Sequence, residues 1–207
     1  HRVANDLAKR EAQRFLRELR LTSGPYYRYA LEARKKYVDL RLKQEPRIRE
    51  IYIRAIDRIS KRIRELALST GISVMTMQHL TELEESLRQE EQLITSTLMT
   101  VVSQSILEAT EAGASYPLNV TLAQIEGRLE KAPIQRIFAR ANTQAVEAIW
   151  ARTHKGMMLS DRIWEKGRKA RQAITEIIQD AVVTGEDPVE TARKLEKYVR
   201  KGRNTLA

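Results

Sequence analysis

The sequence lacks cysteine and has few of the other residue types on which whole classes of site depend. The 207 residues include no cysteine, which excludes disulfides, thiolate metal sites and cysteine nucleophiles. The three histidines, His1, His79 and His154, lie far apart and share no spacing suited to metal ligands. No run approaches the roughly 20 apolar residues that a membrane-spanning helix needs. We therefore expect no metal, no cofactor and no membrane-spanning segment.

Turn-forming and aromatic residues are scarce. The chain has 8 Gly, 5 Pro and 5 % aromatic residues, beside 42 % hydrophobic and 31 % charged residues. Because Gly and Pro mark turns, their scarcity favours long helices over a sheet with many turns. We predict an all-α fold, an elongated multi-helix bundle with long amphipathic helices and a C-terminal helical hairpin.

Positive charge is abundant but unevenly distributed. The net charge is +10, and residues 1–66 hold 19 Lys/Arg against 9 Asp/Glu. Residues 67–132 hold 3 against 9, and residues 133–207 hold 15 against 9. Blocks of like charge are commonly interaction surfaces, although charge on long exposed helices also serves solubility. The basic blocks are thus candidates for contact with a polyanion or an acidic protein.

Apolar residues recur at three- and four-residue steps in the first 66 residues, which predicts helices over 2–21, over 26–43 and from Pro46 onward. Tyrosines among the cations of 26–43 favour packing, with nucleic-acid contact left open. The third helix has the cleanest apolar stripe, formed by Ile48, Ile51, Ala55, Ile59, Ile63 and Leu66. The cations mainly off this stripe are candidate contacts for DNA or an acidic surface: Arg47, Arg54, Arg58, Lys61 and Arg62.

The middle of the chain is acidic. Gly71 ends the third helix, and a long helical pattern covers about 76–112. A DNA-reading helix-turn-helix at this turn is disfavoured, because the acidic run Thr81–Glu85 would be repelled by phosphates. The glutamates lack the Glu-x-x-His repeats of a di-iron bundle, so we interpret them as a solvated face or as partners of the basic helices.

A domain boundary is predicted at 113–119, where Gly, Ser and Pro occur together. It would divide residues 1–113, a basic and then acidic region of long helices, from residues 114–207. Beyond it we expect a short helix over 122–131 and a longer one from Pro133 to Trp150, with a stripe of small residues that would let another helix approach closely.

The C-terminal region contains the most specific local signals. Ser160 is a candidate N-cap, and Asp161 suits the positive end of a helix dipole. Leu159 and Trp164 fit the two positions of a hydrophobic staple around that cap. The helix that follows has an apolar stripe at Ile163, Gly167, Ala170, Ile174, Ile177 and Ala181. Its early turns also carry cations that are candidate contacts for a polyanion or partner: Lys166, Arg168, Lys169 and Arg171.

A second helix is predicted directly after this one. Gly185 suits a helix C-terminus. The residues that follow come close to a capping box. Asp187 would be the N-cap, Pro188 the first helical residue, and Glu190 follows Pro188 by two residues. These residues are therefore interpreted as the architecture of a helical hairpin that continues to Gly202.

The same region resembles a known family. The residues concerned are Ile149-Trp-Ala-Arg-Thr153, Gly156 and Leu159-Ser-Asp-Arg-Ile-Trp164, then a helix and Thr184-Gly-Glu-Asp-Pro-Val-Glu-Thr-Ala-Arg-Lys-Leu-Glu-Lys-Tyr-Val199. This order resembles the minor head, or head-morphogenesis, proteins of tailed bacteriophages. The resemblance covers roughly residues 145–203. In that family an Arg-Thr-Glu run usually follows, and its absence here means either a shorter protein or a missing C-terminal part. Because the sequence starts at His1 and not at Met, we expect residues before it as well.

The resemblance implies a structural protein of the virion, made in the bacterial host cytoplasm and located inside the capsid near the portal vertex. Its implied partner is the portal protein, with packaged DNA and sister copies as further partners, in head assembly, DNA packaging or DNA delivery. The alternative, based on the sequence pI of 9.9, is a helical nucleic-acid-binding protein or regulator of cellular origin. No phosphate loop, nucleophile elbow, zinc pattern or kinase set is present, so we expect no enzyme and no catalytic residue.

Overall fold

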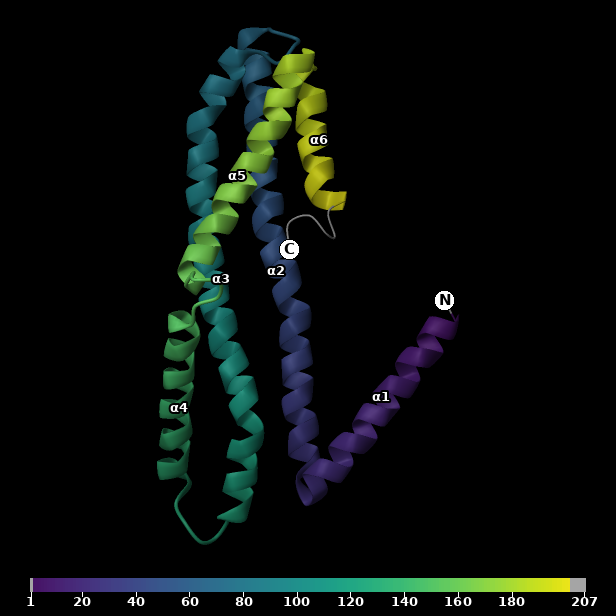
Figure 1. The fold of residues 1–207 in the computed structure, drawn as a ribbon, viewed down its shortest axis with the longest axis vertical. Helices are drawn as coiled ribbons and strands as arrows, with labels where there is room; N and C mark the ends of the chain where they lie inside the picture. Colours follow the sequence, from purple (N-terminus) through teal and green to yellow (C-terminus); the bar gives the residue numbers. More distant parts are fainter. Residues whose placement is uncertain (1, 202–207) are drawn as a thin grey trace. The chain divides into compact units, whose positions relative to one another are not determined.

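The computed structural model describes residues 2–201, and this part of the chain is helical almost throughout (Figure 1). It contains no strand, only an isolated bridge between His154 and Met157. None of its helices is long and apolar enough to cross a membrane. The elements are α1 (Arg2–Ser23), the 3-10 turn η1 (Gly24–Tyr26), α2 (Tyr27–Thr70), α3 (Met77–Gln124), α4 (Lys131–Ala151), α5 (Leu159–Thr184) and α6 (Pro188–Lys201). The all-α class and the C-terminal helical hairpin, α5 and α6, are confirmed.

Two predicted breaks between helices are wrong. Pro46 does not begin a helix but lies inside α2, which joins the two predicted helices on either side of it. The predicted break at 113–119 is likewise helical, with Pro117 inside α3. A proline removes one intrahelical hydrogen bond, and in helices of 44 and 48 residues the remaining bonds carry the helix past it. The chain reverses instead after Gln124, around Gly127, so the predicted helix over 122–131 is also wrong.

The glycine signals before α2 and after α2 are confirmed. Gly24 has φ 51° in η1, and Gly71 has φ 67° directly after α2. The Gly71 N–H donates to the carbonyl oxygen of Ala67 at 3.0 Å, which closes the last turn of the helix. Positive φ is strained for residues with a Cβ atom, so a glycine at a turn is a stronger stop signal than an isolated proline.

The chain forms two compact units, and each is discontinuous in sequence. Unit 1 comprises His1–Lys43 and Ser105–Ile149, and unit 2 comprises Gln44–Gln104 and Trp150–Ala207. Each unit therefore contains part of α2 and part of α3. This division differs from the predicted one at residues 113 and 114, because the long helices continue from one unit into the other.

Unit 2 contains a hydrophobic core to which α2, α3, α5 and α6 contribute. The predicted stripe on α2 is buried from Ile51 to Leu66, whereas Ile48 is only partly covered. The predicted stripe on α5 is also buried, except that Ile178 takes the place of Ile177, which is only partly covered. Burial of each large aliphatic side chain contributes about 1.5–3 kcal/mol. The most deeply buried side chains include Ile59, Ile63, Leu83, Leu87, Ile94, Ile178 and Leu195.

Gly167 allows α5 to pass close to α3. A Cβ atom added at this position would lie 2.2 Å from Oγ1 of Thr95. Thr95 is itself buried and donates to the carbonyl oxygen of Glu91 at 2.8 Å, so its hydroxyl is held in place. At Gly167, within the apolar stripe, the backbone of α5 therefore packs directly against Thr95 of α3.

Unit 1 has almost no core. Among its described residues, those that are buried are Ser23, Ala30, Leu40 and Ala112, and α4 has no buried residue. Large apolar side chains are left uncovered on every helix of the unit, including Leu21 at 77 % exposure, Leu42 at 68 % and Ile137 at 64 %. The apolar stripes predicted there exist, but within this chain little covers them.

Candidate functional site

The end of α5 has the geometry that is typical of a helix that ends at a glycine. Gly185 is left-handed, with φ 62° and ψ 37°. Its N–H donates to the carbonyl oxygen of Val182 at 3.3 Å, and the N–H of Glu186 donates to that of Ala181 at 2.9 Å. These two bonds satisfy carbonyl groups that would otherwise lack partners at the helix end. The sequence-based assignment of Gly185 is confirmed.

The start of α6 is capped by Asp187, as predicted. Its Oδ1 accepts from the N–H of Val189 at 2.7 Å and from that of Glu190 at 3.2 Å. Pro188 is the first helical residue and is buried. Glu190 accepts from Arg193 one turn further on, so the second half of a capping box is replaced by an exposed ion pair.

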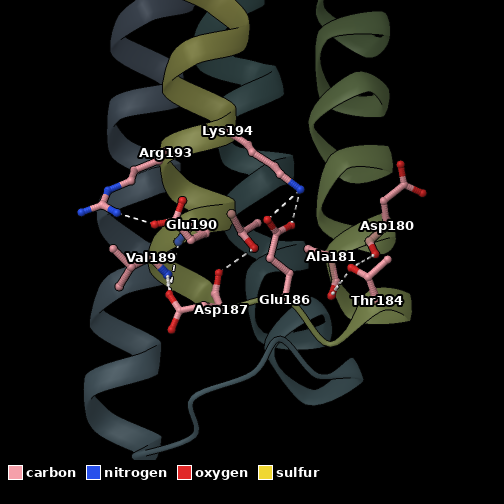
Figure 2. A network of polar contacts seen from close by, with 10 residues as sticks. Asp180, Ala181, Thr184, Glu186, Asp187, Val189, Glu190, Arg193 and Lys194 are labelled. Atoms are coloured by element: carbon pink, nitrogen blue, oxygen red, sulfur yellow. Dashed lines mark hydrogen bonds and ion pairs between the residues drawn. The ribbon is translucent and has the colours of Figure 1, made fainter.

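The turn between α5 and α6 is also tied to the connection between α2 and α3. The N–H of Met75 donates to the carbonyl oxygen of Glu186 at 2.7 Å. The Glu186 carboxylate accepts from Lys194 at 2.7 Å, as Figure 2 shows. At the start of α3 the buried ring of His79 accepts at Nδ1 from the N–H of Thr76, in the α2–α3 connection, at 3.2 Å.

The start of α5 differs from its prediction. The helix begins at Leu159, so Met158 is the N-cap residue and Ser160 lies inside the first turn. The predicted N-cap role of Ser160 is wrong. Asp161 supplies the capping bond instead, because its carboxylate accepts from the Met158 N–H at 3.0 Å. Asp161 is in the first turn, where a negative charge also suits the helix dipole, as predicted.

The predicted hydrophobic staple is absent for the same reason. With the cap at Met158, the staple positions would fall on Met157 and Arg162. Leu159 packs against the core of unit 2, whereas Trp164 is 49 % exposed. The Trp164 side chain is therefore not accounted for by the local architecture.

A tight turn holds the chain in place before α5. Lys155 and Gly156 both have positive φ, 53° and 76°, as the two central residues of a two-residue hairpin turn require. The flanking residues His154 and Met157 exchange N–H···O bonds of 2.9 and 3.1 Å. A lysine with this backbone conformation is strained, which the paired backbone on either side compensates.

Two of the predicted polyanion contacts are instead ion pairs between helices of unit 2. Arg58 on α2 donates to both carboxylate oxygens of Glu90 on α3, at 2.6 and 2.7 Å. The hydrogen bond to Glu90 raises the pKa of Arg58 above its usual value, against an opposing effect of burial. Arg171 on α5 donates to Glu91 on α3 at 3.0 Å. For Glu90 and Glu91, the interpretation as partners of basic helices holds, and we no longer regard Arg58 and Arg171 as polyanion contacts.

The remaining predicted cations are exposed. Arg54 pairs with Glu50, and Lys61 and Arg62 lie near Glu65, all within α2. Lys169 donates to Glu165 at 2.7 Å and lowers the pKa of that carboxyl. Such exposed pairs are worth little, so these cations stay accessible to an anion. Arg47 is exposed, and Lys166 and Arg168 are exposed with no ion pair to any described residue.

The aromatic rings at the start of α2 are packed with arginines. Tyr26 and Tyr29 are stacked at 6.5 Å between ring centroids, with the guanidinium of Arg28 5.6 Å from the Tyr29 centroid. Arg34 lies over Phe15 at 5.1 Å. Tyr26 and Tyr29 are half-buried, which agrees with the favoured interpretation as packing residues, whereas Tyr37 is 48 % exposed.

The described residues contain no group of three or more side chains that could hold a metal ion. A hollow inside unit 2, lined by Tyr52, Ile56, Ile94, Ile174 and Tyr198 among others, has room for about one water molecule. It is a packing gap, and burial there raises the pKa of the Tyr52 hydroxyl.

No protein-family model, curated protein or solved structure matches the chain. Two surfaces stand out as candidate functional sites. One is the uncovered apolar side chains of unit 1. The other is the exposed Trp164 on unit 2, with Arg168 one turn further along α5.

Proposed function

We propose that this chain is a structural minor head protein of a tailed bacteriophage, which associates with the portal protein inside the head. It assists head assembly, DNA packaging or DNA delivery. The proposal is supported by the resemblance of residues 145–203 to that family. The structural observation that carries it is the contrast between a core in unit 2 and the uncovered apolar side chains of unit 1.

Uncovered apolar helix faces favour a protein that is completed by assembly. Most of the stability of protein helices comes from packing of an amphipathic face, and unit 1 packs little of its apolar surface. Exposed apolar side chains that recur along a helix are typical of interaction surfaces. On α4, Ala141 and Ala148 are exposed beside Ile137, and such small side chains let another helix come close. The portal protein is the partner that the family resemblance suggests for this face.

The excess positive charge supports a second contact, with packaged DNA or an acidic portal surface. The cations retained for it are Arg47, Arg54, Lys61, Arg62, Lys166, Arg168 and Lys169. Neutralisation of phosphates by lysine and arginine is independent of sequence and weakens steeply with salt. Equal affinity for unrelated DNA duplexes would fit this contact, whereas selective binding to one sequence would favour the alternative of a cellular DNA-binding regulator.

The experiment is co-sedimentation of the full chain with purified portal protein from the same phage. We expect stoichiometric association, and at least a tenfold weaker association for Ile137→Asp on α4. Leu93→Asp is the matched control, because Leu93 is an exposed apolar residue on unit 2. Absence of association at low salt, or equal losses for both variants, would contradict the proposal.

A further inference from the structure

The N-terminal stretch of unit 1 carries the excess positive charge of that unit. Residues 1–43 hold 12 Lys/Arg against 5 Asp/Glu, whereas residues 105–149, the other stretch of the unit, hold 4 against 5. The cations of the N-terminal stretch lie in α1 and in the first half of α2. The contact with DNA proposed above uses cations of unit 2 only, so it assigns no partner to this charge.

One side of α1 presents a row of arginines. From residue 10 onward, where the side chains of the helix are described, the row consists of Arg10, Gln13, Arg17 and Arg20. Residues three or four apart are neighbours on one side of a helix, and this row extends over about 15 Å of its length. All four residues are exposed, and none of the three arginines has an ion pair with a described residue. We name these four residues the arginine stripe.

The arginine stripe lies on the side of α1 that does not pack. Ser23 is buried and Leu19 is half-buried. The guanidinium of Arg34 on α2 lies 5.1 Å from the ring centroid of Phe15. Phe15, Leu19 and Ser23 follow at four-residue steps and therefore form one side of α1, which the helical periodicity separates from the stripe. The arginines are thus directed away from the contacts that hold α1 to the unit.

The carboxylates on the described part of α1 do not neutralise the stripe. Glu11 follows Arg10 by one position, and Glu18 follows Arg17 by one position. One position is about 100° around a helix, and side chains one residue apart do not face each other. Glu18 instead accepts from Arg14, one turn before it, at 3.1 Å. The charge of the stripe therefore remains available to an anion from outside the chain.

The chemistry of the stripe favours a nucleic-acid duplex over other anions. Arginine and glutamine side chains donate hydrogen bonds, and the guanidinium fork matches two phosphate oxygens at once. A protein partner would need an apolar centre, and the large exposed Leu21 lies only at the end of the stripe. A single strand is bound by stacking on aromatic rings, which the stripe does not contain. A duplex needs neither, and it presents about one negative charge per 1.7 Å of its axis.

We propose that the arginine stripe binds the phosphate backbone of a nucleic-acid duplex, independently of base sequence. Each arginine of the stripe contacts a phosphate, and Gln13 donates to the same backbone between them. The site lies on unit 1 and is separate from the cations of unit 2 in the proposed function. The inference goes beyond that function, because it requires neither the portal protein nor a phage origin of the chain.

Fluorescence anisotropy of a short labelled duplex, titrated with the full chain, tests the inference. The test variant combines Arg10→Gln, Arg17→Gln and Arg20→Gln. Glutamine is close to arginine in helix propensity, so α1 should stay helical, which circular dichroism checks. We expect binding at least about tenfold weaker, because three phosphate contacts are lost. The slope of the logarithm of the binding constant against that of salt concentration should fall by about 2.7, since each phosphate contact contributes about 0.9.

The matched control combines Lys35→Gln, Lys36→Gln and Lys43→Gln. It removes the same charge from exposed positions of unit 1, none of which has an ion pair with a described residue. We expect a loss of affinity below about threefold, because these lysines contribute only at a distance, where salt screens them. Equal losses for the two variants would mean a general effect of charge and would overturn the inference.

Three further results would also overturn it. These are no binding of a duplex by the wild type at low salt, preference for one of several unrelated duplexes, and tighter binding of a single strand than of a duplex. Loss of portal association by the stripe variant, with unchanged affinity for the duplex, would assign the stripe to an acidic protein instead. DNA and RNA duplexes are titrated side by side, and the tighter of the two identifies the source of the phosphates.

Discussion

Unit 2 and unit 1 each contain part of the long helices α2 and α3, but they bury their apolar side chains to different extents. In unit 2, four helices share a core, and ion pairs such as Arg58–Glu90 cross between them. In unit 1, the same kind of amphipathic pattern leaves its apolar side chains largely uncovered. The comparison shows that an apolar stripe indicates a helix face that packs against a partner. It does not indicate whether that partner lies in the same chain.

Truncation of a large aliphatic side chain should show the largest difference in the free energy of unfolding between the two units. Ile59→Ala in unit 2 should lower the free energy of unfolding by about 2–5 kcal/mol, because Ile59 is buried. Ile137→Ala in unit 1 should change it by less than about 0.5 kcal/mol. Urea unfolding followed by circular dichroism measures both variants, because the helices of both units contribute to that signal. Similar losses for the two variants would break the comparison.

The ion pairs should show the next largest difference. Arg58→Ala leaves the buried Glu90 carboxylate without its partner, and we expect a loss of about 1–3 kcal/mol, reduced by the partial exposure of the arginine. Arg54→Ala removes an exposed pair with Glu50 and should cost no more than about 0.5 kcal/mol. The same urea unfolding measures both. A cost for Arg58→Ala as small as the control would show that this pair does not hold α2 to α3.

The two helical glycines provide a matched test of close packing. Gly167→Ala should destabilise unit 2 by about 1–3 kcal/mol, because the new methyl group meets the Thr95 hydroxyl. Gly113→Ala in unit 1 meets no atom within 4 Å and should stabilise its helix by about 0.5–1 kcal/mol. Thermal unfolding followed by circular dichroism measures both. Adding Thr95→Ala should recover part of the loss at Gly167, and no recovery would assign it to another cause.

The smallest expected effect depends on pH. Burial raises the pKa of Tyr52, so the folded chain keeps this hydroxyl neutral above the pH at which an unfolded tyrosine ionises, about 10. The stability contributed by the neutral hydroxyl is complete below that pH and is lost as the pH rises through the folded pKa. Tyr52→Phe should therefore lose less stability than the wild type between pH 8 and 11 in urea unfolding. Parallel losses would mean that Tyr52 ionises equally in both states.

Local chemistry explains which sequence-based predictions succeeded. Asp187, Pro188 and Gly185 act within a few residues of their own positions, so spacing alone predicted their roles. The predictions from Pro46 and Pro117 were wrong because a proline inside a long helix removes only one hydrogen bond, which is too little to end the helix.

Long-range contacts explain most of the rest. Arg58 and Glu90 are 32 residues apart, and no local pattern indicates that they meet. The close approach at Gly167 depends in the same way on where α3 lies. At Ser160 two local candidates competed, and the carboxylate of Asp161 supplied the capping bond. The structural consequence was an exposed Trp164, which the sequence pattern had placed in a staple.

The central claim is that unit 2 is complete in a single chain, whereas unit 1 is completed by a partner. Hydrogen–deuterium exchange of the full chain, alone and with portal protein, tests it most directly. We predict slow exchange over α5 and α6 in both states, and fast exchange over α4 that slows on association. Equal protection of α4 and α5 in the free chain, or no gain over α4 in the complex, would contradict the account.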